Sequence, residues 1–270
     1  MYPGLTKLDL ARYYEIVAEA MVPHIARRPL TLRRYPRGLD APGFVQQHDN
    51  GGLPAPLKSL PIREAEGDVE PHLYIEDAAG LIAAAQMSVL ELHGWGSRID
   101  DLDAPDRLVF DLDPDPSVGF REVVDAALAI RDRLGDIESW PMLSGGKGVH
   151  VVVALDKGHD WATVSGFAKR FATDMAAAEP DAYVAEMSKA ERKGRIFIDW
   201  LRNERGATAV MPLSSRARKG APVAMPVDWE SLRKAKAASA FTVRGVLDEG
   251  FEIPKRWGAK PQRLPSPEDK

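Results

Sequence analysis

Hydrophobic residues recur along the chain with two periods, one typical of strands and one typical of helices. Residues Arg107–Asp113 (RLVFDLD) alternate, so that the apolar positions 108, 110 and 112 share one face of a predicted strand. Residues 120–134 instead repeat apolar positions every three or four residues, which predicts an amphipathic helix. The same patterns predict helices over Leu8–Ala26, Asp77–Met87 and Trp161–Ala178, and strands over Val89–His93, Val149–Leu155 and Arg195–Leu201.

Capping and turn residues mark where these elements begin and end. Thr6, with Asp9 three positions later, predicts the start of the first helix, and Ser117 is the expected cap of the helix over 120–134. Prolines and glycines between residues 33 and 61 predict short strands and turns. Beyond Pro226 we expect one short helix and then a Pro-rich tail.

The order of elements sets the fold class and the domain count. Helices and strands mix without a strict strand–helix–strand rhythm, which predicts an α+β (α/β-type) fold with mixed or antiparallel sheets flanked by helices. The 270 residues contain no repeat and no clear linker, so we expect one catalytic domain over residues 1–257 and a tail over 258–270.

Composition adds constraints on the environment of the protein. The chain is 44% hydrophobic, has no cysteine and contains no apolar run long enough to span a bilayer, so we expect a cytoplasmic protein without membrane contact. The net charge of −4 alone gives no sign of nucleic-acid binding. However, residues 27–37 carry +5 and residues 202–219 carry +4, which leaves −4 − 5 − 4 = −13 for the rest. Solvated loops would explain one such basic stretch, but two beside an acidic motif suit a polyanion and a metal.

Asp111 and Asp113 form the strongest local motif. Side chains two residues apart on a strand project from the same face about 7 Å apart, and two carboxylates so placed need a cation. Asp199 is a third acid, inside the apolar strand RIFIDWL. Three carboxylates from two strands predict a site for one or two Mg²⁺ or Mn²⁺ ions and phosphoryl transfer. The alternatives are an acidic turn after the first strand and an ion pair between Asp199 and Arg202.

A glycine-rich turn supplies the second motif, Ser144-Gly-Gly-Lys147-Gly-Val-His150. Glycines let backbone N–H groups approach a phosphate, and the lysine and histidine add charge and donors. It is not a Walker loop, because the spacing differs and a strand follows it. A plain hairpin turn is the alternative.

Basic residues form the third motif. Arg202 and Asn203 follow the Asp199 strand, and Arg216 and Arg218 would place two guanidinium groups on one side of an extended segment, suited to a triphosphate. A basic surface strand is the alternative. His93, at the end of another strand, is either a further phosphate donor or a histidine satisfied within the core.

Read together and in order, the segments FDLD (110–113), SGGKGVH (144–150) and FIDWLRN (197–203) resemble the three signature motifs of the archaeo-eukaryotic primase superfamily. Longer stretches such as RPLTLRRYPRG (28–38) and ATAVMPLSSRAR (207–218) resemble the polymerase domain of bacterial ATP-dependent DNA ligase D, over residues 2–257. The resemblance implies a primase-like fold and a primase-polymerase that adds nucleotides, ribonucleotides preferred, to 3′ ends at gaps and breaks in non-homologous end joining.

The resemblance also implies roles for single residues. Asp111, Asp113 and Asp199 would be catalytic and hold both metal ions. Phe44 would lie near the nucleotide and template, but Val45 stands where family members often have a second aromatic residue, so base stacking is expected to be weaker. The full set expected at the NTP or dNTP is Arg33, Phe44, His93, Ser144, Lys147, His150, Arg202, Asn203, Arg216 and Arg218.

DNA contacts are expected from Lys7, Lys189 and Arg192. Arg192 matches a basic residue that arranges the primer end, and Lys7 matches one of two lysines that grip a downstream 5′-phosphate. The second lysine is missing from this sequence, which puts recognition of that phosphate in question. No K-x-D-G ligase motif occurs, so joining would need a separate ligase, and a Ku-type end-binding protein is a further expected partner.

Two other function classes compete with this hypothesis. A haloacid-dehalogenase-type phosphohydrolase also has an apolar strand ending in D-x-D, but here Pro114-Asp115 follows, and that family does not explain the glycine-rich turn. A non-catalytic module that bridges DNA ends would use the same basic segments, but it would not need three acids.

Overall fold

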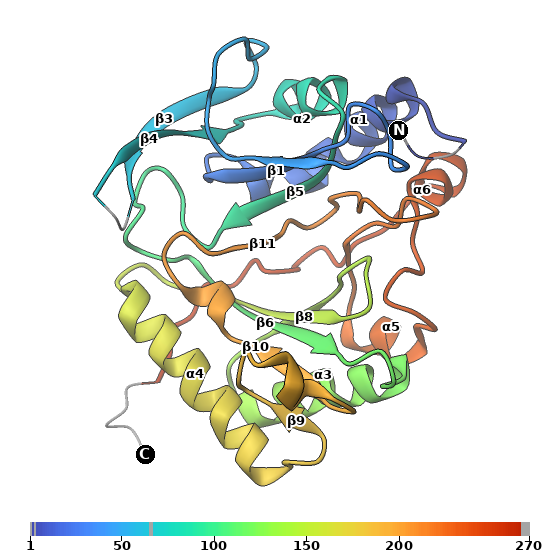
Figure 1. Cartoon of the computed structure of the whole chain (residues 1–270). Helices are drawn as coiled ribbons and strands as arrows, with labels where there is room; N and C mark the ends of the chain where they lie inside the picture. Colours follow the sequence, from blue (N-terminus) through green and yellow to red (C-terminus); the bar gives the residue numbers. More distant parts are fainter. Residues whose placement is uncertain (1, 3, 65–66, 266–270) are drawn as a thin grey trace.

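The described part of the molecule contains two larger β-sheets with helices packed beside them and one two-stranded sheet (Figure 1). The computed structural model describes residues 2, 4–64 and 67–265, with residues 189 and 190 described by their backbone alone. The six-stranded sheet has the order β12-β7-β8-β6-β10-β9. Its strands are β6 (Arg107–Pro114), β7 (Trp140–Leu143), β8 (Val149–Ala154), β9 (Tyr183–Val184), β10 (Ile196–Asp199) and β12 (Met225–Pro226).

Helices α3 (Phe120–Leu134) and α4 (Trp161–Ala178) pack against this sheet. The apolar face of β6 meets them: the ring of Phe110 lies 4.7 Å from that of Phe171 in α4. The opposite face of β6 carries Val109, which is buried in a separate small cluster, and the two aspartates. The alternation expected over 107–113 therefore sorts one face into the core and leaves the acids on the other.

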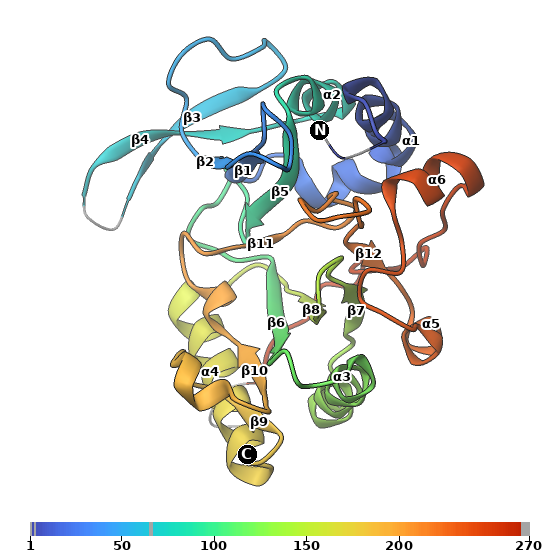
Figure 2. The ribbon, with the colours of Figure 1, turned by 45° about the vertical axis from the view of Figure 1, so that its right-hand side comes forward.

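The second sheet has the order β11-β5-β1-β2 and includes β1 (Leu30–Arg34), β2 (Phe44–Gln46), β5 (Val89–Trp95) and β11 (Thr208–Val210). Helices α1 (Lys7–Ile25) and α2 (Ala78–Gln86) pack together beside it. Strands β3 (Lys58–Arg63) and β4 (Val69–Tyr74) form a separate hairpin, which projects from the body in Figure 2. Because all pairs but β10–β9 are antiparallel, the predicted fold class is confirmed.

Some predicted starts and ends of helices and strands are confirmed, and others differ in the structure. Thr6 and Asp9 form the expected capping box of α1. Helix α3 instead begins after Gly119 without a side-chain cap, because the hydroxyl of Ser117 donates to Asp115 at 2.6 Å. The strand expected over 195–201 ends at Asp199, since Trp200 takes a helical backbone conformation and the short helix η2 (Leu201–Asn203) follows.

The C-terminal region is more structured than expected. Two helices follow Pro226, α5 (Trp229–Lys234) and α6 (Val243–Glu249), where one was predicted. The predicted tail begins at residue 258, and its described part lies against the body. The Gln262 N–H donates to the Ala154 carbonyl at 3.1 Å, and Leu264 is buried. Within the described residues, no helix is long and apolar enough to cross a membrane.

Candidate active site

Antiparallel register places the acids of the site in one row across the six-stranded sheet. Asp111 of β6 lies opposite His150 of β8 on one side and opposite Asp199 of β10 on the other. Adjacent strands are about 4.8 Å apart, so the three ionisable side chains are near neighbours. Asp113 projects from the same strand two residues beyond Asp111. The predicted meeting of acids from two strands therefore occurs at the centre of this sheet.

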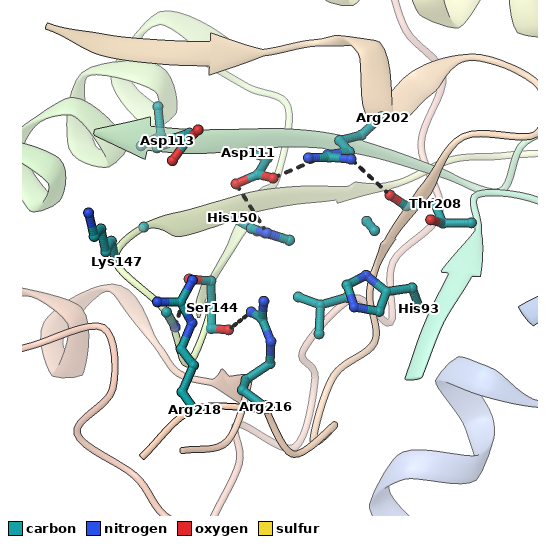
Figure 3. Close-up of a pocket in the computed structure, with 15 residues that line it drawn as sticks. His93, Asp111, Asp113, Ser144, Lys147, His150, Arg202, Thr208, Arg216 and Arg218 are labelled. Atoms are coloured by element: carbon teal, nitrogen blue, oxygen red, sulfur yellow. Dashed lines mark hydrogen bonds and ion pairs between the residues drawn. The ribbon is translucent and has the colours of Figure 1, made fainter. Parts of the chain in front are cut away.

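Arg202 is the cation that joins two of these acids. Its Nε donates to Asp111 Oδ2 at 3.2 Å (Figure 3), and its Nη2 lies 3.0 Å from Asp199 Oδ2. A third donor, Nη1, reaches the Thr208 carbonyl of β11 at 3.3 Å. The ion pair between Asp199 and Arg202, which the sequence left open as an alternative, is thus present. Arg202 also ties the acidic row to the second sheet.

The carboxylates differ in how readily they ionise. Burial alone would raise the pKa of Asp111, but His150, whose Nε2 is 3.3 Å from Oδ1, and Arg202 outweigh burial and lower that pKa. Burial and the nearby Asp111 raise the pKa of Asp113. Burial also raises the pKa of Asp199, against the attraction of Arg202. An arrangement in which neighbouring acids resist ionisation is one that an additional cation would stabilise.

Asp113 has a cationic partner of its own. Arg192 of the short helix η1 (Lys189–Arg192) places Nη1 3.2 Å from Asp113 Oδ2. Its guanidinium lies 3.7 Å from the centre of the Phe197 ring, and its Nη2 donates to the Met187 carbonyl at 2.9 Å. Arg192 is therefore held beside the acidic row, which its predicted role at the primer end requires.

The three aspartates have the donor chemistry of a site for hard divalent ions. Carboxylate oxygens are the ligands that Mg²⁺ and Mn²⁺ prefer, and Asp113 is more than half exposed. In the described part of the chain, however, these aspartates do not form a set whose donor atoms all lie within 4.8 Å of one another. Arg202 and Arg192 form ion pairs with these carboxylates instead, so an ion could bind only if both guanidinium groups moved away from them.

The glycine-rich turn forms a second side of the site, next to the acidic row. The Ser144 N–H donates to the Gly148 carbonyl at 3.1 Å, which makes residues 144–148 a tight hairpin turn between β7 and β8. A Cβ at position 148 would lie 1.9 Å from the Leu112 carbonyl oxygen, so glycine is needed for the turn to approach β6. The Gly145 N–H donates to Ala238 and that of Gly146 to the Ser144 hydroxyl. These two N–H groups already have hydrogen-bond acceptors, so side chains would make most of the contacts to a phosphate here.

One cavity of about 200 Å³ brings the predicted motifs together. Asp111 and Asp113 line one side, and cations from the turn and from the segment after β11 line the other (Figure 3). Strands of both sheets contribute to its walls, with β5 and β11 facing β6 and β8. The predicted nucleotide-binding residues that line it are His93, Ser144, Lys147, His150, Arg202, Arg216 and Arg218.

Glu91 is a buried residue that the sequence analysis missed. Its side chain is 2% exposed, and its Oε2 lies 2.8 Å from His93 Nε2 and 3.4 Å from Arg216 Nε. Its Oε1 accepts the Ala217 N–H at 2.9 Å. Burial opposes ionisation, but the hydrogen bond from His93 and the charge of Arg216 prevail and lower the pKa of Glu91 to about 2. Glu91 thus orients two cavity residues without lining the cavity. A lone acid inside the apolar strand VLELHGW was the available signal.

Other predicted residues lie outside the cavity. The structure corrects the assignment of Asn203 to nucleotide binding. Asn203 is 1% exposed, and its side-chain amide pairs with both the N–H and the carbonyl of Val109, at 2.7 and 2.8 Å. Its amide is therefore used to hold η2 against β6 and is not available to a nucleotide. Arg33 contacts Glu91 at 3.4 Å, and Phe44 is exposed beneath the guanidinium of Arg34.

The predicted DNA-binding residues are dispersed. Lys7 is exposed at the start of α1, where its Nζ donates to the Gln86 carbonyl at 2.7 Å. The backbone of Lys189 lies in η1, but its side chain is outside the described part of the chain. The basic stretch 27–37 is also divided, because Arg27 pairs with Glu76 and Asp100 while Arg28 pairs with Asp106. That stretch does not form one continuous anion-binding surface.

Comparison with known proteins points to one family. A profile of the LigD primase-polymerase domain matches residues 6–257. The chain is 35% identical over 254 residues to the multifunctional non-homologous end joining protein LigD of Pseudomonas aeruginosa, covering 90% of this chain and 30% of that protein. It is 36% identical over 244 residues to LigD of Mycobacterium tuberculosis, covering 86% of this chain and 32% of that protein. The chain thus spans about a third of the length of these relatives.

A solved structure agrees with the sequence comparisons. The polymerase domain of Mycobacterium tuberculosis ligase D, in complex with DNA, superposes with a TM-score of 0.85 at 31% identity. The match covers 97% of this chain and 96% of that one. The similarity therefore extends over nearly the whole chain.

Proposed function

The chain belongs to the LigD primase-polymerase domain family, and from this premise we propose that it adds nucleotides to DNA 3′ ends at gaps and breaks. The observation that supports the proposal is one cavity lined by Asp111 and Asp113 on one side and by basic side chains on the other. Nucleotidyl transfer needs both, because the protein contributes mainly positioning and charge neutralisation. The reaction forms a bond from the primer 3′-oxygen to the α-phosphorus and releases pyrophosphate.

We assign the acidic row to two divalent ions, Mn²⁺ or Mg²⁺. Bound there, the ions would favour ionisation of the primer 3′-hydroxyl and neutralise charge on the triphosphate. Asp111, Asp113 and Asp199 supply the oxygen ligands. Arg202, which touches two of these acids, is placed to turn from them toward the phosphates.

The cationic side of the cavity would hold the triphosphate. Lys147 and Arg218 are exposed at its rim, and Arg216 is held inside it by hydrogen bonding to the Ser144 carbonyl and by Glu91. Arg33 and Phe44 lie outside the cavity, where they would contact the base or the template. We propose that ribonucleotides are preferred, with weak base stacking because Val45 follows Phe44.

The remaining cations would contact DNA. Arg192, beside Asp113, is assigned to the primer end, and Lys7 and Lys189 to the DNA backbone, with Lys7 at a downstream 5′-phosphate. The relatives from Pseudomonas aeruginosa and Mycobacterium tuberculosis are non-homologous end joining proteins. We therefore propose that this chain acts in bacterial end joining in the cytosol, together with a Ku-type protein and a DNA ligase.

Primer extension on gapped DNA tests the proposal. Wild-type protein should extend the 3′ end with Mn²⁺ and an NTP, and should prefer NTP when NTP and dNTP compete. Asp111→Ala should abolish extension, while Asp115→Ala, which removes an acid that accepts from Ser117 and does not line the cavity, should leave it active. Extension that survives Asp111→Ala would refute the metal assignment. DNA binding without extension by the wild type would favour a bridging module, and release of phosphate from phosphomonoesters would favour a phosphohydrolase.

A further inference from the structure

Three side chains outside the cavity converge from three separate segments of the chain. His48 follows β2, Glu64 follows β3, and His72 lies in β4. One donor atom from each lies within 4.8 Å of the other two. Glu64 Oε1 is 3.2 Å from His48 Nε2 and 2.9 Å from His72 Nε2. We propose that this cluster is a second metal site, distinct from the acidic row, and that it binds zinc.

The distances suit an ion of that size. Zinc binds imidazole nitrogen and carboxylate oxygen at about 2.0–2.2 Å, and in a tetrahedral site neighbouring donor atoms are then roughly 3.3–3.5 Å apart. The two nitrogen–oxygen separations are shorter than this by only a few tenths of an ångström. Small side-chain rotations would therefore admit the ion. Two histidines and one glutamate leave a fourth position for water or another ligand.

The donor types distinguish this site from the acidic row. Imidazole favours zinc and similar borderline ions, whereas Mg²⁺ and Mn²⁺ favour all-oxygen sites. His72 is 4% exposed, and its ring centre lies 5.5 Å from that of Trp95 at the end of β5. One ligand is thus fixed inside the protein, and the other two approach it from the surface. A buried ligand already held by packing lowers the ordering cost of binding an ion.

The location gives the ion a structural role. In the described part of the chain, β3 and β4 form a two-stranded sheet that is joined to neither larger sheet, and such a hairpin is marginally stable in isolation. It projects from the body of the molecule, as Figures 1 and 2 show. Backbone contacts join its root to the segment after β2: the Leu73 N–H donates to the Gln47 carbonyl and the Asp49 N–H to the Pro71 carbonyl, both at 2.8 Å. A zinc ion would link His72 in β4 and Glu64 at the turn end of β3 to His48 in that segment, and so would set the direction of the hairpin.

A hydrogen-bonded triad without metal is the competing explanation, because each neutral histidine can donate its Nε2–H to the same carboxylate oxygen. The two explanations differ in a measurable quantity, zinc stoichiometry. Zinc could also bind the acidic row, so the titration should be made on full-length chelator-treated protein carrying Asp111→Asn as background. In that background we expect one equivalent of zinc by calorimetry. Adding Glu64→Gln should remove it.

Glu70→Gln provides the matched control, because Glu70 is another acid of the same hairpin and is not part of the cluster. This variant should retain the full equivalent. His48→Gln should lose it as Glu64→Gln does, and because His48 is partly exposed, circular dichroism can verify that this variant folds. If Glu64→Gln and His48→Gln bind as much zinc as Glu70→Gln, or if the background protein binds none, the site does not exist.

Protease sensitivity gives an independent readout of the structural role. Arg63, the last residue of β3, is an exposed trypsin site next to Glu64. Zinc should slow cleavage at Arg63 in the wild type and in Glu70→Gln, but not in Glu64→Gln. Equal cleavage rates with and without zinc in the wild type would overturn the claim that the ion orders the hairpin. Neither measurement depends on polymerase activity, so the proposed function and the zinc site can fail separately.

Discussion

Replacement of Glu91 by glutamine tests whether a buried charge behind the cavity organises it. The substitution keeps the shape of the side chain and the acceptor for the Ala217 N–H, but it presents an amide donor or an uncharged oxygen to His93 and Arg216. The pKa of Glu91 is lowered from its ordinary value near 4.5 to about 2. At 1.36 kcal/mol per pKa unit, the charge of this 2%-exposed carboxylate stabilises the fold by about 3 kcal/mol.

The expected loss can be measured by urea unfolding and has a defined pH dependence. Because the folded-state pKa is depressed, the stabilisation is fully present above about pH 4.5 and is lost as the pH falls toward 2. Glu91→Gln should therefore be about 3 kcal/mol less stable than the wild type at pH 7, and the difference should shrink to roughly half at pH 3. Glu230→Gln, which removes one partner of an exposed pair with Lys234, should cost less than about 1 kcal/mol.

The same variant should impair nucleotide binding more than turnover. Glu91 orients Arg216 and His93 but does not line the cavity, so its loss weakens ground-state contacts with the triphosphate. We expect the nucleotide KM in primer extension to rise about tenfold, equivalent to roughly 1.4 kcal/mol, with kcat changed much less. Two results would refute this reasoning: a stability difference that stays constant between pH 7 and pH 3, or an unchanged KM in a folded variant.

Two further substitutions test the acidic row and the turn. Arg202→Gln removes the cation between two of the aspartates, so calorimetry should show a lower Tm without metal and a larger rise in Tm on adding Mn²⁺ than in the wild type; equal rises would show that Arg202 and the ion do not compete. Gly148→Ala would place a Cβ 1.9 Å from the Leu112 carbonyl oxygen and should destabilise the protein by at least about 3 kcal/mol, whereas Gly166→Ala in α4 should stabilise it by about 0.5–1 kcal/mol. Unfolding experiments that gave both alanine variants the same stability would contradict this account.

The periodic elements could be predicted from the sequence, but the partners of most polar residues could not. The alternation over 107–113 predicted both the strand and the face on which its acids lie, because apolar burial fixes the phase of a strand. Which strand carries the third acid beside Asp111 depends on the register with β10, which involves residues more than 80 positions away. Only the resemblance to known motifs predicts, from the sequence, that these segments form one site.

Asn203 shows where motif matching misleads. Its adjacency to Arg202 in the sequence predicts a shared role, yet the two side chains make different contacts. The guanidinium reaches forward to the acids, whereas the amide turns back to satisfy the Val109 backbone inside the sheet. No local pattern indicates that a backbone group more than 90 residues away lacks a partner. Glu91 is the opposite case, a functional residue that no motif indicates. A buried acid in an apolar strand needs a cation, as argued for Asp199, and the same argument applied to Glu91 predicts cationic partners.

The distribution of charge reconciles a net charge of −4 with the proposed polyanionic substrate. Of the cations in residues 202–219, Arg202 and Arg216 are paired with buried acids and face the cavity, while Arg218 is exposed at its rim. Divalent ions at the acidic row would release Arg202 and Arg192 from their carboxylates and would themselves add positive charge. The electrostatic field within the cavity would therefore become more positive on metal binding, although the composition of the chain is unchanged. It follows that triphosphate affinity should depend on the divalent ion more strongly than on any single arginine.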